Sequence, residues 1–304
     1  MGAQLRVVRQ RIRATSSIAK ITRAQELIAS SRIIKAQARM VAAQPYAREI
    51  TKAVSSLITH HPSMEHPLLA ERAEQPRRAA MLMLTSDGGF AGAFNANVLR
   101  EGQALAANLR EQNIEPVPFV AGTKGITWHR FRDMHIEDSW NGFSAKPAYE
   151  NAEQMGRRLV EAFNTDDDEG GVDEIHVVYT EFVSMLTQRA VVHRVLPLVI
   201  EESEEEAPSG ATADYEFEPE PEQVLDALLP NYVESRLWAM MLQSAASEWA
   251  ARRRAMKSAT DNANDLISDL TREANQARQA EITQEISEIV GGADALAEAN
   301  AGSE

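Results

Sequence analysis

The sequence has no cysteine, few aromatic residues and no long apolar run. Without cysteine, a disulfide framework, a thiol nucleophile, a cysteine-based metal site and a thiol switch are all excluded. Aromatic residues make up only 6% of the 304 residues, which favours long helices over a β-sandwich or barrel. No stretch approaches the roughly 20 apolar residues of a membrane-spanning helix. Since the basic N-terminus also lacks the apolar core of a secretory signal, we expect a soluble intracellular protein that can dock on a membrane complex.

Charge is distributed unevenly along the chain. The net charge is -14, yet residues 1–60 carry eleven Lys and Arg side chains against two acidic ones. Residues 161–174 hold seven acidic residues and residues 201–222 hold ten, and neither stretch holds a basic residue. We interpret the acidic segments at 165–172 and 201–222 as solvated loops. The basic segment reads as a helix, which predicts an acidic partner: a nucleic acid, a membrane or a protein.

The first long helix is predicted over residues 3–59. No glycine occurs between Ala3 and Thr59, and Pro45, the only breaker, is expected to kink or end the regular part. Apolar positions follow a spacing of three and four residues in two sets with a slip between them. The first set is Leu5, Val8 and Ile12, and the second is Ile18, Ile21, Gln25 and Ile28.

A second long helix is predicted over residues 231–290, with Pro230 in its first turn. Its seam has heptad spacing and then slips by one residue. The seam residues are Ala263, Ile267, Leu270, Ala274 and Ala277, followed by Ile282, Ile286 and Ile289. Because so thin a seam cannot stabilise a lone helix, we expect an antiparallel two-helix coiled coil formed by both ends of the chain.

The middle of the chain alternates strands and helices. Strands are predicted at 79–85, 117–121, 174–179 and 190–200, and helices at 93–111 and 149–164. This alternation predicts a mostly parallel sheet with Rossmann-like layering. The fold class is therefore α/β plus a long coiled coil. The expected domains are an N-terminal helix with its linker (1–75), a Rossmann-like α/β base (76–222) and a C-terminal helix (223–304).

Three segments resemble the gamma subunit of the F-type ATP synthase. They are IRATSSIAKITRAQELIASSRIIKAQ at 12–37, LTSDGGFAGAFNANV at 84–98, and ARRRAMKSATDNANDLI at 251–267 with NQARQAEITQEISEIVGGADAL at 275–296. The last segment is the most characteristic. The chain departs from the family pattern at Gln25, where many members have Met, at Gly88 in place of Arg, and at Ala91 in place of Cys. The regulatory cysteine pair of the chloroplast members is missing.

The resemblance implies a rotor. In that family the coiled coil stands inside a ring of three alpha and three beta subunits, and the base sits on the c-ring with the epsilon subunit. Ion-driven rotation of the c-ring then moves the beta subunits through the conformations that make ATP. The resemblance implies one copy per complex, peripheral to the cytoplasmic face of the cell membrane. It also implies no catalytic residue, cofactor or metal in this chain, and no nucleic-acid partner.

The contact residues that the resemblance implies are mostly cationic. Acidic loops of the beta subunits would attract these cations by long-range electrostatics, which salt screens and which has no fixed direction. Such attraction would keep the shaft centred without favouring one rotational angle. Near the C-terminus, a polar catch with a beta subunit is implied. The candidate residues are Arg6, Arg9, Arg11, Arg13, Lys20, Arg23, Arg252, Arg253, Arg254, Lys257, Arg278, Gln279 and Thr283.

Four short patterns suggest other kinds of site, and each has a plainer structural interpretation. SDGGFAG at 86–92 follows a strand and could cradle a phosphate, but it lacks the dinucleotide-binding glycine spacing. GTKG at 122–125 is read as a plain turn. His60, His61 and His66 lie in a proline-rich, acid-poor stretch that reads as a linker. Asp166, Asp168 and Gly171 have part of the spacing of an EF-hand calcium loop. The twelfth position is Val177 instead of the glutamate that such a loop needs, which excludes a standard EF-hand site.

Two rival functions stay open on sequence grounds. One is an α/β nucleotide-binding enzyme, although no nucleophile–base arrangement, pair of catalytic carboxylates or P-loop can be argued. The other is a coiled-coil scaffold or tether without motor function, which predicts a homodimer. The acidic stretch at 166–171 reads as an inserted loop of the base, for which we consider a role as a brake or as a contact with the c-ring or the epsilon subunit.

Overall fold

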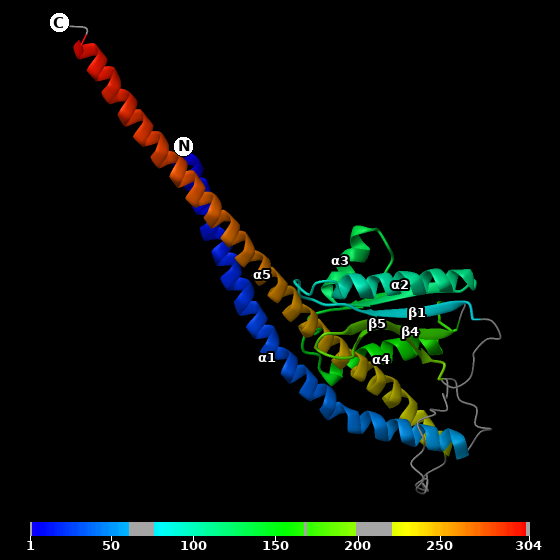
Figure 1. Ribbon diagram of the computed structural model, residues 1–304. Coiled ribbons are helices and arrows are strands. Elements are labelled where there is room, and N and C mark those ends of the chain that lie inside the picture. Colours follow the sequence, from blue (N-terminus) through cyan, green and yellow to red (C-terminus); the bar gives the residue numbers. More distant parts are fainter. Residues whose placement is uncertain (1, 61–75, 167–168, 199–220, 302–304) are drawn as a thin grey trace. The chain divides into compact units, whose positions relative to one another are not determined.

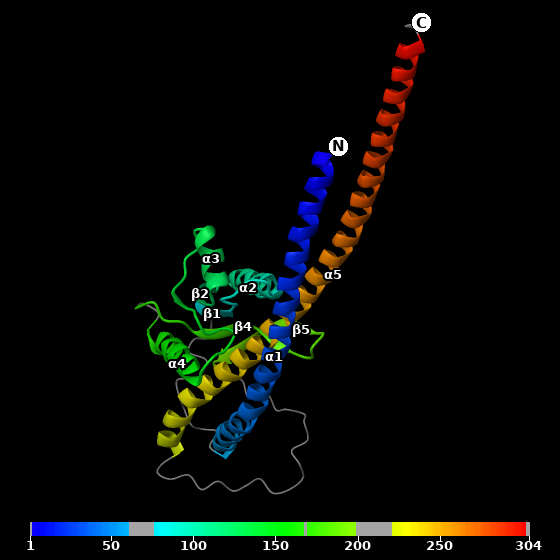
Figure 2. The same cartoon turned by 90° about the vertical axis from the view of Figure 1, so that its left-hand side faces the viewer.

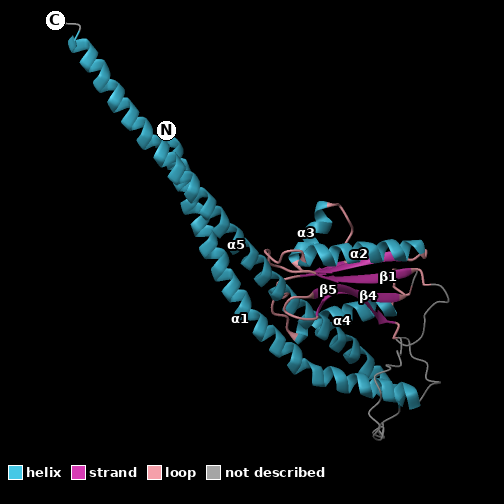
Figure 3. Cartoon of the chain, in the orientation of Figure 1, coloured by secondary structure: helices cyan, strands magenta, loops and turns pink. Residues whose placement is uncertain are grey.

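The computed structural model describes residues 2–60, 76–166, 169–198 and 221–301. These residues form two compact units, one over Ala29–Arg252 and the other from residues 1–28 together with 253–304. Figure 3 distinguishes the helices from the strands. The elements are α1 (Gly2–His60), β1 (Arg78–Leu84), α2 (Phe94–Glu111), β2 (Glu115–Ala121), α3 (Thr123–Phe131), β3 (Asp138–Trp140), α4 (Tyr149–Asn164), β4 (Glu174–Phe182), β5 (Gln188–Leu196) and α5 (Pro221–Ala301).

The unit over Ala29–Arg252 contains a five-stranded sheet in the order β3-β2-β1-β4-β5. Neighbouring strands run parallel except β4 and β5, which are antiparallel. The prediction of a mostly parallel sheet is therefore confirmed. Six of the seven residues of β1 are buried, because this central strand is covered on both faces. Helices α2 and α3 lie on one face of the sheet, and α4 and the first part of α5 lie on the other (Figure 1).

The two faces carry separate cores. On the α4 side, Leu159 joins Leu57 of α1 and Leu237 of α5 in one buried cluster with the strands. On the α2 side, smaller clusters contain Val98 of α2 and Ile126 of α3. Both long helices thus pack against the α/β part within this unit, so that the sheet is attached to them through buried apolar surface.

Burial along α1 repeats every three and four residues without interruption. The side chains at these positions are buried or half-buried, and their immediate neighbours are mostly exposed. We call this stripe the α1 seam; it comprises Leu5, Val8, Ile12, Thr15, Ala19, Thr22, Glu26, Ala29, Ile33, Ala36, Met40, Ala43, Ala47, Ile50, Val54 and Leu57. A constant heptad is the spacing by which one helix keeps the same face towards a partner.

The predicted slip of the α1 stripe is wrong. Ile18, Ile21, Gln25 and Ile28 are exposed, and the repeat continues instead through Thr15, Ala19 and Thr22. Apolar character misled the prediction, because small and hydroxyl-bearing residues fill the seam here. Thr260 Oγ1 of α5 donates a hydrogen bond of 2.8 Å to Thr22 Oγ1, which satisfies the hydroxyl groups where two backbones lie close together.

In the unit formed by the two chain ends, α1 and α5 pack antiparallel. Leu5, Val8 and Ile12 of α1 form one cluster with residues of α5, namely Leu270, Ala274 and Ala277. Farther along α1, Thr22 bonds to Thr260. Residue numbers thus rise along α1 while those of the contacted α5 residues fall, as antiparallel packing requires. The heptad predicted from Ala263 to Ala277 is thus buried or half-buried as expected.

The last part of the predicted α5 stripe behaves differently. Ile282, Ile286 and Ile289 are exposed, by 72% in the case of Ile289. The reason is geometric: α1 begins at Gly2, and α5 continues past that end of its partner (Figure 2). We therefore correct the expectation that these residues extend the intrachain seam.

The long helices are less sensitive to breakers than predicted. Pro45 lies inside α1, which continues to His60. Pro230 lies inside α5 instead of opening it, and α5 runs through Gly291 and Gly292 to Ala301. Each proline removes one backbone hydrogen bond, but in helices of this length tertiary burial on either side maintains the helical path.

Two short elements were not predicted. GTKG does not form a plain turn, because α3 begins at Thr123 and Lys124 is exposed on it. Gly122 precedes this helix with φ of 100°, where a Cβ would lie 2.2 Å from the Thr85 carbonyl oxygen. Strand β3, of three residues, is also new. His60 ends α1, whereas His61 and His66 lie outside the described residues. So do residues 201–220 of the acidic segment, and residues 221–222 belong to α5.

The seam generates a stability prediction with a control on the same helix. Leu270 is 3% exposed in the seam, whereas Leu266, one turn earlier, is 43% exposed. Leu270→Ala should lower the free energy of unfolding by about 2–3 kcal/mol, near the low end for buried leucines because a two-helix seam surrounds the side chain incompletely. Leu266→Ala should change it by less than about 0.5 kcal/mol. Urea denaturation followed by circular dichroism measures both, and equal losses would contradict the seam.

Candidate protein-interaction surface

Cations form a stripe beside the α1 seam. Five of the six candidate cations of α1 each directly follow a seam residue, and all are exposed: Arg6, Arg9, Arg13, Lys20 and Arg23. They therefore share one flank of the helix. Arg23 donates to Glu26 Oε2 at 2.7 Å, within the same helix. Exposed side chains in such a row keep their solvation and present positive charge along the helix.

The other flank of α1 is partly apolar. Arg11, the sixth candidate, lies on this side, as do Val7, Ile18, Ile21 and Ile28, which are 47–62% exposed. Apolar side chains in a row on a surface are typical of a protein-binding face. The sequence pattern predicted that the three isoleucines pack in the seam. Because they are exposed instead, this flank of α1 is a candidate contact surface.

The four candidate residues at the middle of α5 differ in environment. Arg254 and Lys257 are exposed, and Lys257 lies 3.8 Å from Asp261 in a pair across one turn. Arg253 is half-buried, and its Nε atom has no hydrogen-bond partner among the described residues. Arg252, by contrast, is buried in the unit that carries the sheet.

The three candidate residues near the C-terminus, Arg278, Gln279 and Thr283, are all exposed on α5. The Thr283 hydroxyl donates to the Gln279 carbonyl oxygen at 2.9 Å, a bond within the helix. Ile282 and Ile286 beside them are exposed as well. This end of α5 therefore offers polar groups and apolar side chains together.

Arg252 is held by three contacts inside the protein. Its Nη2 atom lies 2.6 Å from Glu248 Oε1, and its Nε atom donates to the Gly89 carbonyl oxygen at 3.2 Å. The guanidinium also lies over Trp249, 4.6 Å from the ring centre. A Cβ at Gly88 would come within 3.0 Å of Nη2, so glycine at this position leaves room for the arginine.

The partner of Arg252 was not foreseen from the sequence. Glu248 is 1% exposed, and burial raises the pKa of its carboxyl group, although Arg252 and a hydrogen bond from Ser144 oppose that rise. A buried carboxylate of this kind depends on its cation. The spacing Glu248–Arg252, one helical turn, was the only sequence signal for the pair.

The SDGGFAG loop has a structural role in this fold. Asp87 accepts hydrogen bonds from the backbone N–H groups of Thr123 at 3.0 Å and Ser144 at 2.9 Å. Burial would raise the pKa of Asp87, but backbone hydrogen bonds from Gly142, Ser144 and Thr123 outweigh it and lower the pKa. The loop that could have cradled a phosphate thus carries a carboxylate, and this carboxylate binds the backbone at the start of α3.

Two features are absent from the described part of the chain. No group of three or more His, Cys, Asp or Glu side chains there could hold a metal ion. Across the same residues, no helix combines the length and the apolar character that crossing a membrane requires.

Comparison with known proteins identifies the family. A family model described as ATP synthase matches residues 4–296. The ATP synthase gamma chain of Acidothermus cellulolyticus is 60% identical over 296 residues, which cover 97% of this chain and 98% of that one. The gamma chain of Thermobifida fusca is 57% identical over the full length of both chains. The chain belongs to the ATP synthase gamma chain family.

Solved structures agree on the fold. A chain of the Euglena gracilis mitochondrial ATP synthase (OSCP/F1/c-ring) has a TM-score of 0.63 at 15% identity, covering 97% of this chain and 95% of that one. A chain of the Tetrahymena thermophila central stalk/c-ring structure has a TM-score of 0.59 at 19% identity, covering 79% and 99%. As a gamma chain, the protein is a non-catalytic subunit of the ATP synthase.

The buried ion pair predicts unequal effects of neighbouring arginines. Arg252→Gln leaves Glu248 buried without its cation and should lower the free energy of unfolding by about 3–5 kcal/mol. Arg254→Gln, at an exposed position two residues away, should change it by less than about 0.5 kcal/mol. Urea denaturation at neutral pH measures both values.

The loss in Arg252→Gln should depend on pH. Without the cation, the raised pKa of Glu248 rises further, so the folded state holds a proton that the unfolded state has released. Stability is then gained at acidic pH and lost as pH rises through the pKa of the folded state. The variant should approach the wild type at acidic pH and diverge from it as pH rises through the pKa of folded Glu248, and Glu248→Gln in the same chain should flatten the difference. A loss independent of pH would contradict the pairing.

Proposed function

We propose that this chain is the central rotor shaft of an F-type ATP synthase. It couples ion-driven rotation of a c-ring to conformational cycling of the catalytic beta subunits, and so to ATP synthesis. The observation that carries the proposal is the 60% identity to a gamma chain over nearly the full length of both proteins. Two structures of similar fold, the Tetrahymena thermophila central stalk with its c-ring and a Euglena gracilis rotor, support the same role.

The shaft itself is a two-helix antiparallel coiled coil in this proposal. Its support is the unbroken α1 seam and the cluster that joins Leu5 and Val8 to Leu270 and Ala274. Residues 76–222 serve as the Rossmann-like base, with residues 1–75 and 223–304 as the two arms of the shaft. Hydrogen-bonded helices packed along a seam transmit torque with less local deformation than loops, since each residue is fixed by backbone bonds and by its partner.

The partners are three alpha and three beta subunits around the shaft, with the c-ring and an epsilon subunit at the base. One copy of this chain serves each complex, at the cytoplasmic face of the cell membrane and peripheral to it, in ion transport coupled to ATP synthesis. The exposed cations and isoleucines of α1 support such a ring of partners. A rotor affects catalysis only through contact energies that differ between conformations of its partners.

The contact residues fall into two groups in this proposal. Exposed cations guide the shaft by soft electrostatics: Arg6, Arg9, Arg11, Arg13, Lys20, Arg23, Arg254 and Lys257. Arg278, Gln279 and Thr283 form the polar catch near the C-terminus. We also keep Arg252 and Arg253 as candidate contacts, with Arg252 acting through the loop at Gly88 and Gly89, to which it is bonded.

The alternatives explain less of the molecule. A nucleotide-binding enzyme would need an anion site at the loop 86–92, but the carboxylate of Asp87 lies in that loop and binds the backbone of Thr123 and Ser144. A homodimeric tether would not need the seam of α1 to meet α5 of the same chain. We therefore favour the rotor.

Affinity purification from native membranes tests the proposal. The tagged full-length chain should bring down three alpha and three beta subunits per copy, together with epsilon and c subunits, as measured by native mass spectrometry. An untagged strain provides the control for adventitious binding. Recovery of the chain alone, as a homodimer or with nucleic acid would contradict the rotor assignment.

A further inference from the structure

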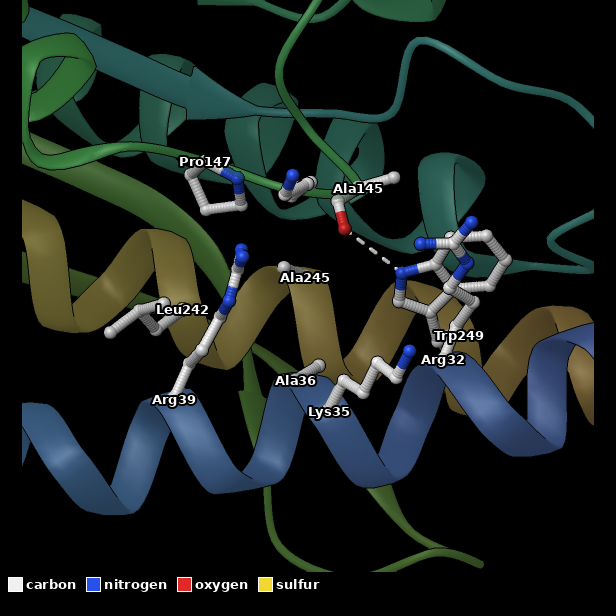
Figure 4. Close-up of a pocket in the computed structure, with 10 residues that line it drawn as sticks. Arg32, Lys35, Ala36, Arg39, Ala145, Pro147, Leu242, Ala245 and Trp249 are labelled. Carbon is white, nitrogen blue, oxygen red and sulfur yellow. Dashed lines mark hydrogen bonds between the residues drawn. The ribbon is translucent and has the colours of Figure 1, made fainter.

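A cationic pocket lies in the unit that carries the sheet. It has a volume of about 250 Å³ and lies between α1, α5 and the segment before α4 (Figure 4). Arg32, Lys35 and Arg39 come from α1, and Lys146 comes from the segment before α4. None of the four was singled out from the sequence, because the folded chain brings Lys146 to residues more than a hundred positions earlier.

The four cations of this pocket lack an acidic partner among the described residues. No ion pair is formed by Arg32, Lys35, Arg39 or Lys146 within the described part of the chain, and no acidic side chain of that part lines the pocket. The three cations of α1 are spaced by three and four residues, so they share one face, and Figure 4 shows them rising from the helix towards Ala145 and Pro147. Like charges at this spacing repel one another, a cost that a bound anion would remove.

The pocket has an ordered, apolar floor. Ala36, Leu242 and Ala245 are buried. Trp249 donates from Nε1 to the Ala145 carbonyl oxygen at 2.9 Å, a bond drawn in Figure 4. This bond fixes the segment that carries Lys146 against α5, so the cationic rim is positioned before any ligand arrives.

We propose that this pocket binds a small polyvalent phosphate anion. Two guanidinium groups offer paired donors that match phosphate oxygens, and two ammonium groups add charge without demanding a direction. The volume suits a pyrophosphate or the phosphate groups of a nucleotide, and it is too small for a helix of a partner protein. The apolar floor beneath the rim suits the base of a nucleotide. The shared ligand chemistry is the phosphate oxyanion, and the inference does not depend on the rotor function.

Calorimetric titration of the full-length chain at low salt tests this site. Pyrophosphate and ADP are the two probes. Replacing Lys35 and Arg39 by Gln should weaken binding of the probe by at least about tenfold, since two charge-assisted contacts are lost. The matched control replaces two exposed cations outside the pocket, Lys124 and Arg110, by Gln. It removes the same net charge and should leave binding within about twofold, as expected for distant sites.

The outcomes separate the two sources of phosphate. Pyrophosphate binding as tight as ADP binding indicates a site for free phosphates, and tighter ADP binding indicates a nucleotide site that uses the floor. In the latter case, Trp249 emission should change with ADP, and Trp249→Phe removes that signal. No binding of either probe up to about 10 mM would overturn the proposal. Equal weakening in pocket and control variants would also overturn it, because it would assign the attraction to diffuse charge.

Discussion

The repeat of three and four residues along α1 is the constraint on which the rest of the structure depends. It runs from Leu5 to Leu57 without a slip. At one end it meets α5 through Leu270 and Ala274, and farther along Leu57 joins the core that covers the sheet. Because the period never changes, the same face of the helix is buried throughout, and its two flanks are left for cations and for exposed isoleucines.

Small residues in the seam decide which side chains become surface. Thr15, Ala19 and Thr22 occupy positions that larger apolar residues could have taken, and the Thr22–Thr260 bond satisfies the polar groups there. Ile18, Ile21 and Ile28 are consequently exposed. In the proposed rotor, this arrangement gives a thin shaft whose outer surface carries both the cations and the apolar side chains available to surrounding subunits.

Sequence reasoning anticipated the architecture better than the particular contacts. The two long helices, the alternating strands and the mostly parallel sheet follow from periodicity, and the structure bears them out. The slip at Ile18 was wrong because hydrophobicity alone cannot recognise a seam made of Ala and Thr. The predicted ends of α5 are wrong because Pro230 and Gly291 are treated as helix breakers. Sequence alone does not show the packing that keeps the chain helical past them. Arg252 illustrates the limit most clearly, since its sequence context resembles a charged surface and only the fold reveals Glu248 beside it.

Rotation of this chain within an assembled complex is the central claim, and the missing cysteine makes it accessible to measurement. Gln112, exposed just after α2 in the α/β part, can be replaced by Cys to give a single attachment point in this subunit. With the complex immobilised through its beta subunits, an optical probe on Cys at this position should turn in one direction when ATP is added and stop when ATP is withdrawn. A complex that hydrolyses ATP while the probe stays still would contradict the account.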